Sequence, residues 1–121
     1  MDVFEEAPRP PNAIIMEYVE NMETLSVNNY TETRASKIKD IAVRFNQLGV
    51  SHCDSYPRNM QFVAGKDGEH DRVLWIDFED AELLEPNPSK QYLREWLRDD
   101  LGTVCKFLDE MANDYARASE R

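Results

Sequence analysis

The stretch that decides the fold is HCDSYPRN at residues 52–59, which is followed by the strand-like sequence RVLWIDF at residues 72–78. Its polar residues are spaced as H-x-D-x-x-x-x-N, and Asp77 follows Asn59 by eighteen residues. Pro57 has a restricted φ and lacks an N–H group, so residues 51–59 are predicted to form an irregular loop. The sequence therefore predicts a loop rich in polar side chains that leads into a β-hairpin.

The segments around this loop have the periodicity of regular elements. Apolar residues at positions 38, 41, 42, 45 and 48 predict a helix over residues 36–48, and Gly49 supplies its stop. Strands are predicted over residues 60–64 and 72–78, with both faces of the second strand covered because residues 73–76 are all apolar. Beyond a break at residues 86–89, with Ser89 as the expected N-cap, apolar steps of three or four predict one long helix, or two that meet near residues 102–103.

The N-terminal residues are predicted to form another hairpin. Apolar runs at residues 3–7 and 13–19 flank a proline-rich turn at residues 8–12, and both runs are expected strands. Residues 20–33 are polar and are predicted to be a loop or a short helical turn. The order of hairpin, helix, loop, hairpin and helix is an α+β fold, and 121 residues make a single domain around one core.

Composition restricts the partners of the chain. Fourteen Lys and Arg residues against 24 Asp and Glu residues give a formal charge of −10, which disfavours nucleic acid and anionic membrane surfaces. The longest uncharged apolar run, at residues 13–16, is too short to cross a bilayer, and the acidic N-terminus is unlike a signal peptide. Cys53 and Cys105 are isolated, so we expect neither a disulfide framework nor a zinc site. These features predict a soluble cytoplasmic protein.

The order of the motifs resembles the protein-kinase-like superfamily. The resemblance is to its atypical branches, the small-molecule kinases and fungal kinase-like proteins, more than to the typical eukaryotic protein kinases. It is carried by the H-x-D-x-x-x-x-N loop, by DFE at residues 77–79 and by IMEYV at residues 15–19, which resembles the hinge strand between two kinase lobes. It implies a kinase-like C-lobe over residues 21–121, mainly helical with a catalytic-loop β-hairpin. A remnant N-lobe hairpin and hinge would precede it over residues 1–20.

The resemblance implies a role for each residue of the loop motif. Asp54 would accept the proton of an attacking hydroxyl group, and His52 would brace the loop. Asn59 and Asp77 would be ligands of Mg²⁺, since the charge of a transferring phosphoryl group requires a cation held by oxygen atoms.

The hinge-like segment would bind the nucleotide. By resemblance, the carbonyl group of Glu17 and the N–H group of Val19 would face the adenine edge of ATP, with Met16 beside it. ATP and Mg²⁺ are therefore the expected cofactors.

Three features depart from the family pattern. Tyr56 replaces the lysine that typical protein kinases have two residues after the catalytic aspartate, as in the atypical branches, and Glu79 replaces the glycine of Asp-Phe-Gly. The chain also contains no G-x-G-x-x-G loop, and the lysine and glutamate that clamp the phosphates in the N-lobe have no counterpart. We therefore expect a truncated kinase-like protein whose activity is weak or depends on a missing N-lobe.

Two main function classes remain open. The retained Asp54, Asn59 and Asp77 favour a phosphotransferase, or the catalytic half of one that another chain or upstream sequence completes. The absent phosphate clamp favours a non-catalytic pseudokinase or protein-interaction module. A lesser alternative is that the acidic cleft is reused for acid–base chemistry on a small molecule. A protein partner or a second copy is expected to cover the open edge of the N-terminal hairpin.

Overall fold

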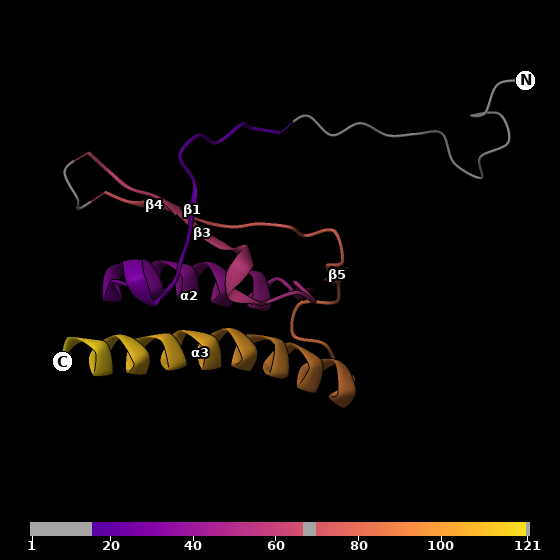
Figure 1. The fold of residues 1–121 in the computed structure, drawn as a ribbon. Helices are drawn as coiled ribbons and strands as arrows, with labels where there is room; N and C mark the ends of the chain where they lie inside the picture. Colours follow the sequence, from indigo (N-terminus) through magenta and orange to yellow (C-terminus); the bar gives the residue numbers. More distant parts are fainter. Residues whose placement is uncertain (1–15, 67–69, 121) are drawn as a thin grey trace, which may run out of the picture.

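The structure, a computed structural model, describes residues 16–66 and 70–120. In chain order its elements are β1 (Glu23–Thr24), the 3₁₀ helix η1 (Val27–Asn29), α2 (Glu32–Gln47), β2 (Val50–Ser51), the 3₁₀ helix η2 (Pro57–Asn59), β3 (Met60–Val63), β4 (Arg72–Trp75), β5 (Glu82–Leu83) and α3 (Gln91–Ser119). Figure 1 shows α2 and α3 side by side, with β1, β3 and β4 on the far side of α2 from α3. The fold is α+β, as the sequence predicts.

Two small antiparallel sheets hold the loops in place. β3 is the central strand of the order β1-β3-β4, with Met60 opposite Trp75. β2 and β5 form the second sheet, with Val50 opposite Leu83. The predicted hairpin over residues 60–64 and 72–78 is present as β3 and β4, although both strands are shorter than expected.

The core lies between α2, the three-stranded sheet and the middle of α3. Its buried apolar side chains are Leu25, Ala35, Ile38, Ala42, Met60, Phe62, Trp75, Val104, Leu108 and Met111. Of the predicted apolar stripe, Ile38 and Ala42 are buried in this core and Ile41 and Phe45 pack against it, whereas Leu48 is exposed. On β4 the expectation of two covered faces is only partly met, because Trp75 is buried while Val73 and Leu74 are half-buried.

Helix α2 begins earlier than the apolar stripe indicates. Its first residue is Glu32 because Thr31 caps the helix, with its Oγ1 accepting the backbone N–H of Arg34 at 3.0 Å. The helix ends at Gln47, and Gly49 adopts the left-handed conformation with φ of 77°. The glycine stop is therefore confirmed, and the helix starts four residues before the predicted start because Thr31 caps it.

Helix α3 is a single helix that passes through residues 102–103 without interruption. The expected N-cap, Ser89, is wrong, since the capping position is Lys90 and its side chain makes no capping hydrogen bond. The Arg94 guanidinium instead donates to the carbonyl oxygens of Pro88 and Ser89, so the preceding chain is held from within the helix. In the part of the chain that the structure describes, neither helix is long and apolar enough to cross a bilayer.

The predicted N-terminal strand is wrong where it can be compared. Residues 16–19 form no strand, and Glu17 is instead joined to Arg72 of β4 through its side chain, at 2.7 and 2.8 Å. The rest of that hairpin, at residues 3–15, lies outside the described residues. The strand predicted over residues 72–78 ends at Trp75, because Asp77 adopts a left-handed φ of 61° that interrupts extended pairing.

Candidate functional site

The loop at residues 52–59 is held by hydrogen bonds within itself. The backbone N–H of Asp54 donates to Nδ1 of His52 at 3.1 Å, and the side-chain amide of Asn59 donates to the carbonyl oxygen of Asp54 at 2.8 Å. Between them, Cys53 adopts a left-handed φ of 66°, which reverses the chain after His52. The three motif residues thus fold into one connected turn, whose position is determined by side chains.

This loop is joined directly to the end of β4. The backbone N–H of Ile76 donates to the carbonyl oxygen of Asn59 at 2.9 Å, and Nε2 of His52 contacts the carbonyl oxygen of Ile76 at 2.7 Å. Because Nδ1 of His52 accepts the Asp54 N–H, the second hydrogen bond must use a proton on Nε2. Asp77 is the next residue along the chain, so the structure brings the H-x-D-x-x-x-x-N loop and Asp77 to one place.

Aromatic packing fixes the orientation of His52. Its side chain is completely buried, and its ring stacks on Trp75 with 4.4 Å between centroids and an interplanar angle of 19°. Phe78 contacts the ring at 4.4 Å, and Phe45 contacts both Trp75 and Phe78. The histidine is therefore held between the loop, β4 and α2, where it links backbone groups and has no route to solvent.

The two predicted Mg²⁺ ligands differ in their surroundings. Asn59 is buried and its amide group is used to hold the loop, whereas Asp77 is exposed. In residues 16–66 and 70–120, the Asp77 carboxylate has no hydrogen-bond or ion-pair partner. The strained φ of Asp77 therefore presents an unpaired carboxylate directly beside the loop.

The Asp54 carboxylate is paired with a cation that the motif did not indicate. Nη2 of Arg58 lies 2.7 Å from Oδ1 of Asp54, and their side chains are 66% and 16% exposed. The Arg58 guanidinium also lies over the ring of Tyr56, at 4.9 Å from the centroid. Arg58 lies two residues after Tyr56 and provides a positive charge beside Asp54. The four-residue spacing of the two charges is the only sequence signal of this pair.

Helix α3 fastens the loop from the other side, through residues that sequence reasoning missed. Oδ1 of Asp100 accepts the hydroxyl of Ser55 at 3.2 Å, and Oδ2 accepts the backbone N–H of His52 at 3.4 Å. One turn earlier, the indole N–H of Trp96 donates to Oγ of Ser51 at 2.9 Å. Trp96 is 41% exposed, and its indole N–H joins α3 to the start of the loop.

A groove, named here the hinge groove, lies beside Asp77. It encloses about 880 Å³ and is lined by residues 16–19, 22 and 74–79. The structure therefore brings the predicted nucleotide-binding residues Met16, Glu17 and Val19 to the same groove as Asp77. Within the described chain, His52, Asp54 and Asn59 lie outside its lining.

An ion pair holds the hinge-like segment against β4. The guanidinium of Arg72 lowers the pKa of the Glu17 carboxyl by hydrogen bonding and then by its charge, and Glu17 raises the pKa of Arg72 in return. Both side chains are more than half exposed, at 53% and 63%, so the pair orients the segment while adding little stability.

The oxygen atoms at this site suit a metal that arrives with its substrate. Among the described residues, no three His, Cys, Asp or Glu side chains gather as a self-sufficient metal centre. Asp77 offers one exposed carboxylate, whereas the amide oxygen of Asn59 belongs to a buried side chain outside the lining of the hinge groove. Mg²⁺ is commonly held by one or two carboxylates together with water and substrate phosphates, so the donor set fits Mg²⁺ bound with a nucleotide.

Comparisons of this chain with protein-family models, with curated proteins and with solved structures find no match. Its function must therefore be inferred from the residues and their arrangement.

Proposed function

We propose that the chain binds a Mg²⁺–nucleoside triphosphate in the hinge groove and forms the C-lobe-like part of a kinase-like phosphotransferase. The observation that carries this proposal is the shared lining of that groove. Met16, Glu17 and Val19 line it together with Asp77. A volume of about 880 Å³ is within the range of small-molecule sites.

The lining suits a planar base followed by charged groups. Most of it is apolar, with Leu74, Ile76 and Phe78 available to contact a ring. Asp77 and Asn59 would hold Mg²⁺, which neutralises the charge of the phosphates when it is bound. The nucleotide base would therefore lie along the hinge side, and the phosphates would point toward the loop.

Asp54 is the proposed acceptor of a proton from an attacking hydroxyl group. Asn59 holds its backbone carbonyl, and His52 holds its backbone N–H, so its position is fixed before any ligand binds. Nη2 of Arg58 lies 2.7 Å from Oδ1 of its carboxylate and holds the side chain in one orientation.

The same ion pair favours a second candidate, a nucleotide-binding module without catalysis. Oδ1 of the Asp54 carboxylate already accepts a hydrogen bond from Arg58, so a substrate hydroxyl group would have to share this carboxylate with the arginine. The 121 residues also contain no G-x-G-x-x-G loop to cover phosphates. In this second candidate, nucleotide binding is retained while phosphoryl transfer by this chain alone is absent.

Nucleotide binding is tested by thermal unfolding with and without ATP and MgCl₂. A ligand at about ten times its Kd stabilises a protein by about 1.4 kcal/mol, which raises the Tm of a domain this size by roughly 4–8 °C. We expect this rise with Mg²⁺ and ATP together and a much smaller one with ATP and EDTA. Asp77→Asn should abolish it, whereas Asp80→Asn, the same change at an exposed residue three positions away, should retain it.

The outcomes separate the candidates. No rise in Tm at millimolar nucleotide, or equal rises in the two variants, would contradict the proposed site. A rise without ADP formation in the presence of a hydroxyl acceptor would favour the non-catalytic module. ADP formation that is lost in Asp54→Asn, with nucleotide binding retained, would establish the phosphotransferase.

A further inference from the structure

A second groove lies away from the loop, between the C-terminal end of α2 and the first half of α3. We name it the helix groove. It encloses about 600 Å³, within the range of small-molecule sites, and its lining includes Asn46 and Gln47 of α2, Asn87 and Pro88, and one face of α3 from Arg94 to Cys105. None of these residues belongs to the site described above.

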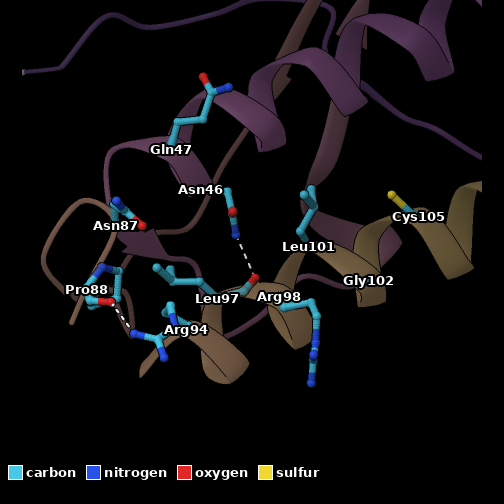
Figure 2. A pocket seen from close by; sticks show the side chains of 10 residues that line it. All are labelled: Asn46, Gln47, Asn87, Pro88, Arg94, Leu97, Arg98, Leu101, Gly102 and Cys105. Atoms are coloured by element: carbon cyan, nitrogen blue, oxygen red, sulfur yellow. Dashed lines mark hydrogen bonds between the residues drawn. The ribbon is translucent and has the colours of Figure 1, made fainter. Parts of the chain in front are cut away.

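The helix groove has a polar end and an apolar end. In Figure 2, Arg94 lies beside Pro88 and Asn87 at one end, and Cys105 lies at the other. Leu97 and Leu101 line the middle. The two ends are eleven residues apart on α3, which is about 16 Å along a helix. An elongated molecule with one polar group therefore matches the groove.

The charge of the lining is opposite to that of the chain. The chain has a net charge of −10, yet the residues of this groove include two arginines, Arg94 and Arg98, and no Asp or Glu. Arg98 is 75% exposed at the rim, where its contact with Asp99 is long, at 3.8 Å. Local positive charge in an acidic protein attracts an anion, so charge complementarity indicates the sign of the ligand.

Arg94 is oriented before a ligand arrives. Its Nη1 donates to the carbonyl oxygens of Pro88 and Ser89, and this fixes the plane of the guanidinium. Nε and Nη2 have no partner within the described residues, so donors remain for a carboxylate, sulfonate or phosphate oxygen. An oriented guanidinium loses less conformational entropy on binding than a free one.

The apolar end is open because of a glycine. A Cβ atom built on Gly102 has nothing within 4 Å, so the helix leaves empty space between Leu101 and Cys105. Asn46 of α2 also lines the groove, and its amide donates to the carbonyl oxygen of Leu97 at 2.6 Å, which joins the two helices there. The open space at Gly102 leaves room for the apolar body of a ligand.

From this arrangement we propose that the helix groove binds a small organic anion, with its anionic group at Arg94 and its apolar body along Leu97, Leu101 and Gly102. This proposal does not depend on nucleotide binding. It predicts that affinity requires both parts of the ligand, because the two ends of the groove differ in chemistry.

The test uses the fluorescent probe 8-anilinonaphthalene-1-sulfonate, with its neutral analogue N-phenyl-1-naphthylamine as the ligand control. Gly102→Leu places a side chain in the empty space and replaces a helix-interior glycine with a better helix former, so the fold is retained. Gly102→Ala adds one methyl group at the same position and is the matched control. Titrations are followed by fluorescence, and folding of each variant is checked by circular dichroism.

We expect Gly102→Leu to weaken binding of the sulfonate probe by about tenfold or more, whereas Gly102→Ala should bind it within about twofold of wild type. The neutral analogue should bind to the wild type at least about tenfold more weakly than the sulfonate probe does. Arg94→Gln should reduce the sulfonate affinity and remove the preference over the neutral analogue. Unchanged binding to Gly102→Leu would overturn the proposal, since the probe would then lie elsewhere, for example in the hinge groove. Equal affinity for the two probes would overturn the role of Arg94.

Discussion

Gly49→Ala and Gly102→Ala are the same substitution, and the structure predicts opposite effects for them. Gly49 has a φ of 77°, and a Cβ atom there would lie 2.6 Å from the backbone carbonyl of Glu85 and from the carbonyl oxygen of Leu84. In addition, the Gly49 carbonyl oxygen accepts the N–H of Leu84 at 2.6 Å. An alanine at this position must therefore push β5 away from β2.

The expected loss of stability has two parts. A left-handed conformation costs a residue with a side chain about 1–2 kcal/mol, and loss of the Leu84 hydrogen bond costs about 0.5–1.5 kcal/mol. Gly49→Ala should therefore lower the free energy of unfolding by about 1.5–3.5 kcal/mol and the Tm by on the order of 10 °C. Gly102 lies inside α3 with open space around it, so Gly102→Ala should raise the free energy of unfolding by up to about 1 kcal/mol.

The assay is urea unfolding of wild type and both variants, followed by circular dichroism, with the slope of the transition compared as well as its midpoint. Gly49→Asn separates the two causes of strain, because asparagine tolerates a left-handed φ but carries the same Cβ atom. We expect it to be destabilised by the hydrogen-bond part alone, about 0.5–1.5 kcal/mol, and therefore less than Gly49→Ala. If either Gly49 variant unfolds within about 0.5 kcal/mol of wild type, the close approach of Glu85 to this turn is refuted.

Three further predictions concern the groups that hold the loop and the start of β4. His52→Phe keeps an aromatic ring but leaves two buried backbone groups without partners, so unfolding measurements should show a loss of about 1–3 kcal/mol. Asp100→Ala removes the acceptor of two hydrogen bonds from the loop, so a similar loss of about 1–3 kcal/mol in the free energy of unfolding is expected. The slowly exchanging backbone amides of α3 should keep their protection in hydrogen exchange. The pKa of Asp71 is lowered below its ordinary value of 3.8, mainly by the hydrogen bond from the backbone N–H of Gly65 and next by the hydrogen bond from Arg34. The stability that ionised Asp71 contributes is complete above this ordinary value and is lost as the pH falls through the lower folded pKa. Urea unfolding midpoints measured between about pH 5 and pH 2 should therefore fall less with decreasing pH in Asp71→Asn than in wild type.

The long elements could be predicted because their signal is local. The apolar stripe of α2 and the repeat along α3 identify both helices, and the glycine after α2 identifies its end. The start of α2 was misplaced because Thr31 lies before the first residue of the stripe and shows its capping role only through its bond to Arg34. The strand expected over residues 13–19 relied on composition alone, and residues 16–19 have no strand partner in the described chain.

The candidate site could be predicted only in part, for the same reason. The spacing of His52, Asp54 and Asn59 indicates one loop, and the structure joins them by hydrogen bonds. Asp100 and Trp96 could not be found from their own segment, because they contact residues 45 to 48 positions earlier in the chain. Such residues look like an ordinary solvent-facing acid and a core aromatic until the helix is packed against the loop.

The position of His52 also has a consequence for the order of folding. Its side chain bonds to a residue 24 positions away and its backbone N–H to one 48 positions away, so the loop is complete only when β4 and α3 are both in place. Contacts that close long loops form late, since their entropic cost is paid before any stabilising contact is made. A refolding experiment should therefore detect helix formation before His52 is buried, and a chain that has not docked α3 would have secondary structure without the completed loop.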